Sequence, residues 1–220
     1  ASKQKRKLNL KLVGDVIKEC FMPVTIGGGV STIDDINNLL KIGADKVVIK
    51  SAALTDLEFI REAVDFFGSQ CISIAVDGVK KGDNYYIHND LGIDMTVKDF
   101  IERMNVAKVG EFIVTSVDND GTSHGADFNL LDSVRDILTV PLIYSGGISS
   151  SSEVESILGA PHVYGVSIGS SFHKHSLNPA DLKEYLTNSA CSDYVRARSH
   201  SRLQDKSLLP LEGKRLGIVD

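Results

Sequence analysis

Two glycine-rich segments of similar sequence occur 118 residues apart, and this spacing constrains the fold more than any other feature. The first pairs Ile26-Gly27-Gly28-Gly29-Val30 with a strand-like run that ends at Ser51, and the second pairs Tyr144-Ser145-Gly146-Gly147-Ile148 with a run that ends at Ser170 and Ser171. Gly29 and Gly147 are 118 residues apart, and Ser51 and Ser170 are 119 apart. Such a constant register predicts two copies of one structural unit.

Strand-like and helix-like segments alternate along almost the whole chain. The predicted strands cover residues 23–26, 46–49, 71–76, 112–115, 140–144 and 163–168. The predicted helices cover residues 33–42, 57–67, 97–106, 129–138 and 152–158. Alternation of this kind predicts a parallel sheet, and the repeat favours two half-barrels over an open sheet. We therefore predict an α/β fold, a phosphate-binding (βα)8 TIM-type barrel with about six of its eight strands in this chain, with residues 82–92 as an inserted hairpin.

The composition is that of one globular domain. The chain has 220 residues, of which 42% are hydrophobic and 24% charged, enough for one sizeable core. A net charge of −5 argues against nucleic acid as a partner. No apolar run approaches the roughly 18 residues of a membrane span. Three widely spaced cysteines form neither a disulfide framework nor a zinc site, so we expect a cytoplasmic protein.

Each half of the repeat predicts one phosphate site. Glycines let an oxyanion approach bare backbone N–H groups, and the start of the next helix adds further donors and the positive end of a dipole. A single Gly-Gly pair is also typical of a tight turn. Two pairs in register, each followed by a serine before a helix, predict an elongated substrate with a phosphate at each end.

Asp77 and the segment 118–121 are the acidic candidates at the carboxyl ends of strands, where barrel active sites lie. Asp77 follows the strand 72–76 and is a candidate general acid or base, with a loop cap as the alternative. The sequence Asp-Asn-Asp-Gly at 118–121 is also ordinary turn chemistry. A calcium loop is excluded because Asn129 stands where the twelfth position needs glutamate. Asp120 and Gly121 remain candidates for substrate or phosphate contacts.

Lys46 and Glu111 begin their strands, at the opposite face, where an ion pair is the simplest reading. His173 and His175 have the spacing of metal ligands but no matching third ligand, so we expect surface histidines and no metal site.

Four motifs together resemble the cyclase subunit of imidazole glycerol phosphate synthase, over roughly residues 1–187. They are Pro-x-Thr-x-Gly-Gly-Gly at 23–29, Gly-Ala-Asp-Lys-Val at 43–47, Thr-Ser-x-Asp-x-Asp-Gly-Thr at 115–122 and Ser-Gly-Gly at 145–147. The resemblance implies an ammonia-dependent lyase and cyclase that forms imidazole glycerol phosphate from a bisphosphorylated ribulosyl intermediate in histidine biosynthesis. It also implies a glutaminase partner and no metal or organic cofactor.

The resemblance also implies roles for individual residues. Asp77 matches a catalytic carboxylate, Lys46 and Glu111 match members of a charged ring that gates ammonia, and Asp45 matches a contact to the glutaminase. The implied substrate and phosphate contacts are Gly29, Lys50, Ser51, Asp120, Gly121, Ser145, Gly147, Gly169 and Ser170.

The chain departs from the family pattern at two positions. Lys50 stands where the family usually has asparagine, and Ser123 stands where it often has a basic residue. A paralogous branch that builds acetamidino groups on surface-polysaccharide sugars with ammonia shares the style of residues 19–23 and 67–70. That activity and an inactive phosphate-binding scaffold are the alternatives.

The two ends of the chain carry separate expectations. Residues 1–4 match the loop after the family's second strand, so we expect an N-terminally truncated chain without the first strand and its catalytic carboxylate. Residues 188–220 form a tail outside the family pattern. Its end, residues 214–220, resembles the opening strand of a glutaminase, or could fill the slot of the first strand.

Overall fold

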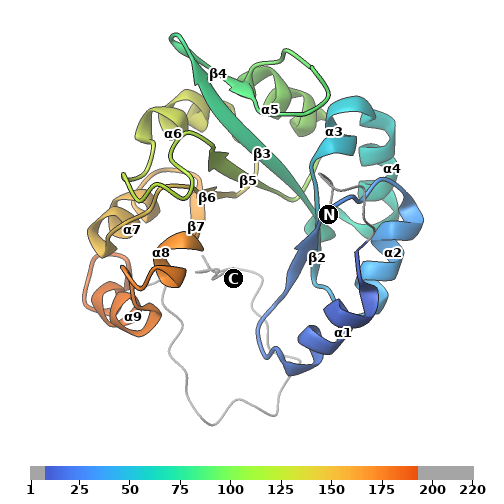
Figure 1. Ribbon diagram of the computed structural model, residues 1–220. Coiled ribbons are helices and arrows are strands. Elements are labelled where there is room, and N and C mark those ends of the chain that lie inside the picture. The colour runs from blue at the N-terminus through green and yellow to red at the C-terminus, as the bar shows by residue number, and fades with distance from the viewer. Residues whose placement is uncertain (1–7, 193–220) are drawn as a thin grey trace.

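A curved parallel sheet with helices on its outer side forms the body of the protein, as the computed structural model shows (Figure 1). The structure describes residues 8–192. Six parallel strands lie in the order β1-β2-β3-β5-β6-β7, and β4 pairs with β3 alone. Their bounds are β1 Thr25–Gly27, β2 Lys46–Ile49, β3 Ile72–Lys81, β4 Asn84–Ile87, β5 Glu111–Ser116, β6 Leu142–Ser145 and β7 Val163–Ser167.

The helices follow the strands in the alternation that the sequence predicts. Their bounds are α1 Leu10–Glu19, α2 Ile33–Lys41, α3 Ser51–Thr55, α4 Leu57–Phe67, α5 Val97–Val106, α6 Phe128–Val134, α7 Ser151–Leu158, α8 Ser170–His173 and α9 Pro179–Thr187. Two short 3-10 helices cover Ser69–Cys71 and Arg135–Ile137, so the helix predicted over 129–138 divides into α6 and a 3-10 turn. The fold class is confirmed as a partial (βα)8 barrel.

Side chains alternate between the two faces of the sheet, as a strand's period of two requires. Side chains such as Val47, Ile49, Ile74 and Phe112 point outward and are fully buried under the helices. The intervening residues face the concave side, and most are half-buried. The concave face is therefore where polar side chains can meet a ligand.

The two halves of the repeat share their local geometry. Helices α2 and α7 both begin with a capping box, formed by Thr32 with Asp35 and by Ser150 with Glu153. Thr32 and Ser150 are 118 residues apart, the same offset as the glycine loops. The internal repeat inferred from the sequence is thus present in three dimensions.

Strand β3 is longer than predicted, which corrects the placement of Asp77 at the end of a strand. The hairpin predicted at 82–92 pairs β4 with the second half of β3, from Gly78 opposite Ile87 to Lys81 opposite Asn84. These antiparallel hydrogen bonds extend β3 to Lys81. Asp77 therefore lies inside a paired strand.

The predictions for residues 1–4 and for 193–220 fall outside the described residues. Within the described part, no helix is long and apolar enough to cross a membrane. The proposed division at residues 187 and 188 stays a prediction.

Candidate active site

A row of polar residues crosses four neighbouring strands near their carboxyl ends. Asp77 lies opposite Thr115, Thr115 opposite Ser145, and Ser145 opposite Ser167. All four are half-buried between buried neighbours, so they share the concave face. Although β3 continues past Asp77, its parallel pairing with β5 ends one residue later, at Gly78. Asp77 thus stands at the carboxyl-end rim, as expected of a catalytic residue in a barrel.

The Asp77 carboxylate is paired with Lys50. The Lys50 Nζ lies 2.5 Å from Asp77 Oδ2, and the two side chains are 39% and 24% exposed. Lys50 was expected among the phosphate contacts, but its ammonium group points to the carboxylate of the next strand. The centre of the rim therefore contains a charged pair that water and ligands can reach.

The first glycine loop leads from β1 to α2. Gly28 and Gly29 have φ of 123° and 70°, a region that side chains rarely adopt. Gly29 is exposed, and a Cβ added there would meet no described atom within 4 Å. Ser51 is also exposed and is the first residue of α3. Among the described residues, no atom would contact a Cβ at Gly29, so the backbone of this loop is open to the solvent there.

The second glycine loop also has two successive positive φ values but a different environment. Gly146 and Gly147 have φ of 102° and 80°. A Cβ on Gly147 would lie 2.2 Å from the carbonyl oxygen of Gly125 and 2.7 Å from Cβ of Asn119. Gly147 is buried, and its carbonyl oxygen accepts a hydrogen bond from Gly125 N at 3.0 Å. Glycine is needed here for close packing as well as for φ.

The residues after β7 complete the second half. Gly169 and Ser170 are half-buried at the start of α8, next to the polar row. The expected contact Ser170 is followed by Ser171, which is 1% exposed and donates its hydroxyl to the carbonyl of Ile148. Ser171 therefore ties α8 to the second glycine loop, a role that the sequence prediction missed.

Glu153 connects this glycine loop to the loop after β5. Its carboxylate accepts hydrogen bonds from Ser149 N at 2.8 Å, Ser150 N at 3.1 Å and Ala126 N at 3.3 Å. Burial raises the pKa of the Glu153 carboxyl, but these hydrogen bonds outweigh it and hold the pKa below its ordinary value. Glu153 is therefore a charged anchor behind the rim.

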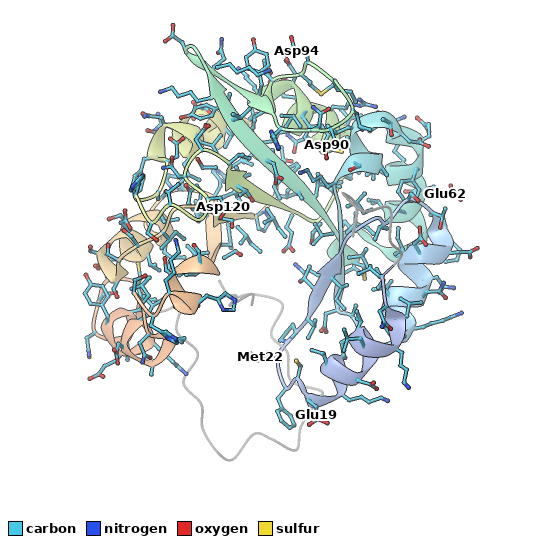
Figure 2. The ribbon with its side chains drawn as sticks, in the orientation of Figure 1. Glu19, Met22, Glu62, Asp90, Asp94 and Asp120 are labelled. Atoms are coloured by element: carbon cyan, nitrogen blue, oxygen red, sulfur yellow. The ribbon has the colours of Figure 1, made fainter. Side chains whose placement is uncertain are left out.

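The turn at 118–121 divides its residues between structure and solvent. Asp118 accepts a hydrogen bond from Lys80 N at 2.8 Å, so it ties the hairpin to the loop. Asp120 is exposed on the rim loop (Figure 2). The Gly121 carbonyl accepts a hydrogen bond from Lys174 Nζ at 2.6 Å. No sequence pattern predicts this contact of Lys174, because its partner is a backbone atom 53 residues away.

A second network behind the rim contains Tyr85, Asp127 and Tyr144. The Tyr85 hydroxyl lies 2.8 and 2.9 Å from the two Asp127 oxygens, and Asp127 N donates to the Tyr144 hydroxyl at 2.7 Å. Burial, with the Asp127 charge, raises the pKa of Tyr85, and burial raises the pKa of Tyr144 to about 12. Both phenols therefore stay protonated at neutral pH and hold the hairpin against α6 and β6.

A surface hollow of about 430 Å³ lies beside this network, lined by Lys80, Tyr85, Asp118, Asn119 and the segment 126–129. Neither Asp77 nor Lys50 lines it. The hollow therefore lies apart from the charged pair at the rim.

The opposite end of the strands contains the expected ion pair. The Lys46 ammonium contacts Glu111 Oε2, and Ser73 Oγ donates to Glu111 Oε1 at 2.5 Å. Glu111 is 6% exposed, so both of its oxygens are satisfied within the sheet. Asp45 is exposed beside them and accepts a hydrogen bond from Val24 N at 2.8 Å. The ion-pair prediction is confirmed.

Histidines and carboxylates do not gather into a metal site in the described part of the chain. His173 and His175 are exposed, as predicted. No group of three or more histidine, cysteine, aspartate or glutamate side chains among residues 8–192 could hold a metal ion.

Comparison with known proteins identifies the family to which this chain is similar. A family model described as "Histidine biosynthesis protein" matches residues 1–178. The imidazole glycerol phosphate synthase subunit HisF of Clostridium botulinum is 37% identical over 195 residues, covering 86% of this chain and 76% of the relative.

Two further relatives carry the provisional name imidazole glycerol phosphate synthase subunit hisF2. The protein of Vibrio vulnificus is 43% identical over 151 residues, 67% of this chain and 56% of the relative. The protein of Campylobacter jejuni is 40% identical over 184 residues, 82% of this chain and 73% of the relative. The chain thus spans a little over half of the Vibrio relative and about three quarters of the other two. It belongs to the histidine biosynthesis protein family, among the subunits of the imidazole glycerol phosphate synthase type.

Proposed function

We propose that this protein is an ammonia-dependent cyclase and lyase that forms imidazole glycerol phosphate from a bisphosphorylated ribulosyl intermediate. One observation carries the proposal. The half-buried Asp77 carboxylate stands on the concave face at the carboxyl-end rim, and two glycine loops with similar positive φ values lie on either side of it in the sheet order. A ligand with a phosphate at each end would lie across Asp77.

Asp77 would transfer protons during ring closure and elimination. A carboxylate at the rim can accept a proton from one substrate atom and return it to another, which is general acid and base catalysis. The hydroxyls of Thr115 and Ser145 share its row and can donate hydrogen bonds to substrate oxygens. The remaining substrate and phosphate contacts would come from both glycine loops, from the loop after β5 and from the starts of α3 and α8. They are Gly29, Ser51, Asp120, Gly121, Gly147, Gly169 and Ser170.

Ammonia would enter from the opposite end of the strands. Glu111 is nearly buried there, with one oxygen held by Lys46 and the other by Ser73. A pair of this kind closes a path to charged species, because an ion that displaced Lys46 would leave the buried charge of Glu111 unpaired. Neutral ammonia does not compete for either charge, so it can pass without leaving a buried charge unpaired.

A glutaminase would dock on the same end of the barrel. Asp45 is exposed there, and two large apolar side chains precede β1, with Phe21 87% and Met22 60% exposed. Figure 2 shows Met22 beside Glu19, where the chain leaves α1. Apolar side chains gathered at one end of a protein are typical of interaction surfaces.

Rescue of a histidine-requiring bacterial strain tests the proposal. We expect the intact gene to restore growth without histidine, and its purified product to turn over the ribulosyl bisphosphate in high ammonium. An Asp77→Asn gene expressed at the same level is the matched control and should not restore growth. Failure of the unaltered gene despite normal expression would reject the histidine-pathway assignment.

Amidine formation on a sugar is the second candidate. The two hisF2 relatives are 43% and 40% identical to this chain, and the HisF relative is 37% identical. Lys50 also departs from the asparagine usual in the cyclases. Ammonia-dependent formation of an acetamidino sugar, with no rescue of histidine growth, would select this function. Binding of a bisphosphate without turnover of either substrate would instead select a phosphate-binding scaffold.

A further inference from the structure

We propose that Lys50 is a positioning residue for Asp77 and not a phosphate contact. This inference deepens the proposed function and rests on it. It assigns to one side chain the task of orienting the catalytic carboxylate.

The strand geometry brings Lys50 to this place. Side chains at 46, 48 and 50 lie on the concave face, because Val47 and Ile49 are buried on the other side. Ile49 pairs with Ile74, so Lys50 leaves β2 just below the level of Asp77 on β3. A lysine side chain is long enough to span this step, and its ammonium reaches Asp77 Oδ2 at 2.5 Å.

The repeat shows that the backbone at this position does not require a lysine. Lys50 has φ of −119° and ψ of −80°, and Gly169, 119 residues later, has φ of −112° and ψ of −72°. The same turn into a short helix is therefore made in the second half without a side chain. The turn therefore does not need the charge of Lys50. The Lys50 ammonium faces Asp77, the one carboxylate in the polar row.

The orientation of the Asp77 carboxylate depends on this contact with Lys50. Lys50 Nζ is the only side-chain group among residues 8–192 that hydrogen-bonds the Asp77 carboxylate. An ammonium group at this distance forms a charge-assisted hydrogen bond, which fixes the direction of one carboxylate oxygen. The second oxygen is left for the substrate.

The pair also balances charge during proton transfer. When a substrate O–H or N–H gives its proton to Asp77, the bonding electron pair stays on the substrate atom and the carboxylate becomes neutral. The proton transfer leaves the sum of charges at the rim unchanged, and the ammonium of Lys50 stays near the negative charge that has moved from Asp77 to the substrate. Electrostatic stabilisation of this kind is stronger in a site that a bound ligand shields from water than in free solution.

A double-mutant cycle with a binding probe tests the inference. The variants are Lys50→Met, Asp77→Asn and the double variant, with Lys98→Met on the exposed face of α5 as the control for loss of a lysine. Calorimetry measures the Kd for ribulose 1,5-bisphosphate, and steady-state assays in ammonium measure kcat and KM. Urea unfolding measures the coupling between the two positions.

We expect Lys50→Met to lower kcat by about 10- to 100-fold. This decrease is smaller than the one expected for Asp77→Asn, which removes the acid–base group itself. The Kd for ribulose 1,5-bisphosphate and KM should change by less than about 3-fold, and the double variant should turn over no more slowly than Asp77→Asn. Lys98→Met should match the unaltered protein in every measurement.

Three results would overturn the inference. A loss of bisphosphate affinity of about 10-fold or more with kcat retained would make Lys50 a phosphate contact. An unchanged kcat would show that Asp77 does not need Lys50. Absence of turnover in the unaltered protein would reject the proposed cyclase. The role of Lys50 is then tested by the coupling free energy from urea unfolding, together with the Kd for the bisphosphate. Coupling of positions 50 and 77 with unchanged bisphosphate affinity supports the pair, and absence of coupling rejects it.

Discussion

Replacing Gly147 by alanine should destabilise the protein far more than the same change at Gly92. Both glycines have a left-handed backbone, with φ of 80° and 71°, so each alanine costs about 1–2 kcal/mol from conformation alone. A Cβ on Gly92 would meet nothing within 4 Å. A Cβ on Gly147 would lie 2.2 Å from the Gly125 carbonyl oxygen, which no real structure tolerates without movement of that loop.

The difference between the two variants follows from this clash. Overpacking of a closed site costs about 1–3 kcal/mol. Displacement of the loop also breaks the 3.0 Å hydrogen bond from Gly125 N to the Gly147 carbonyl, worth about 1 kcal/mol. Gly147→Ala should therefore be about 2–4 kcal/mol less stable than Gly92→Ala.

Urea unfolding followed by circular dichroism measures the difference, since a change in midpoint at constant slope is a change in stability. For a domain of this size it corresponds to a gap in Tm of about 4–16 °C. Equal destabilisation of the two variants would refute the packing argument. It would show that φ alone explains the second glycine loop.

Three further substitutions test the rim and the anchors behind it. Asp77→Asn should lower kcat/KM by about 100- to 10,000-fold while the free energy of unfolding changes by less than about 1 kcal/mol; intact turnover would contradict the assigned role. Glu153→Gln should cost about 1–3 kcal/mol of stability at neutral pH, because charged hydrogen bonds to two loops are weakened. The folded-state pKa of Glu153 is lowered, so its contribution is complete above the ordinary glutamate pKa and is lost as pH falls through the folded value. The stabilities of this variant and the unaltered protein should thus converge below about pH 4, and a constant gap would contradict the assignment. Tyr85→Phe removes the donor 2.8 Å from Asp127 and should cost about 1–2 kcal/mol in urea unfolding, while an unchanged midpoint would show that the network contributes nothing.

Much of the fold could be predicted because local signals agreed with one another. The strand at 46–49 and the helices at 57–67 and 97–106 match the structure residue for residue. Their apolar spacing matches the burial of one face, so periodicity alone located them. The 118-residue repeat then distinguished a barrel from an open sheet.

The missed features depend on contacts between distant residues. The pairing of Lys50 with Asp77 joins positions 27 apart, and the Tyr85 contact to Asp127 joins positions 42 apart. A lysine after a strand is typical of many solvent-exposed turns, so its type and position carry no sign of its partner. The length of β3 was underestimated for a related reason, since pairing with β4 extends the strand as far as Lys80 and Lys81, which are polar and exposed.

The position of Asp77 inside β3 has a consequence for how heat would inactivate the protein. Its backbone is held on one side by the ladder to β5, and its carbonyl accepts a hydrogen bond from His88 N at 2.7 Å. A catalytic group on a flexible loop loses its geometry well before the protein melts, because loops open locally at low cost. Asp77 can move away from the rim only if the central strand of the sheet separates from its neighbours. Thermal loss of activity and thermal loss of the sheet should therefore be one event.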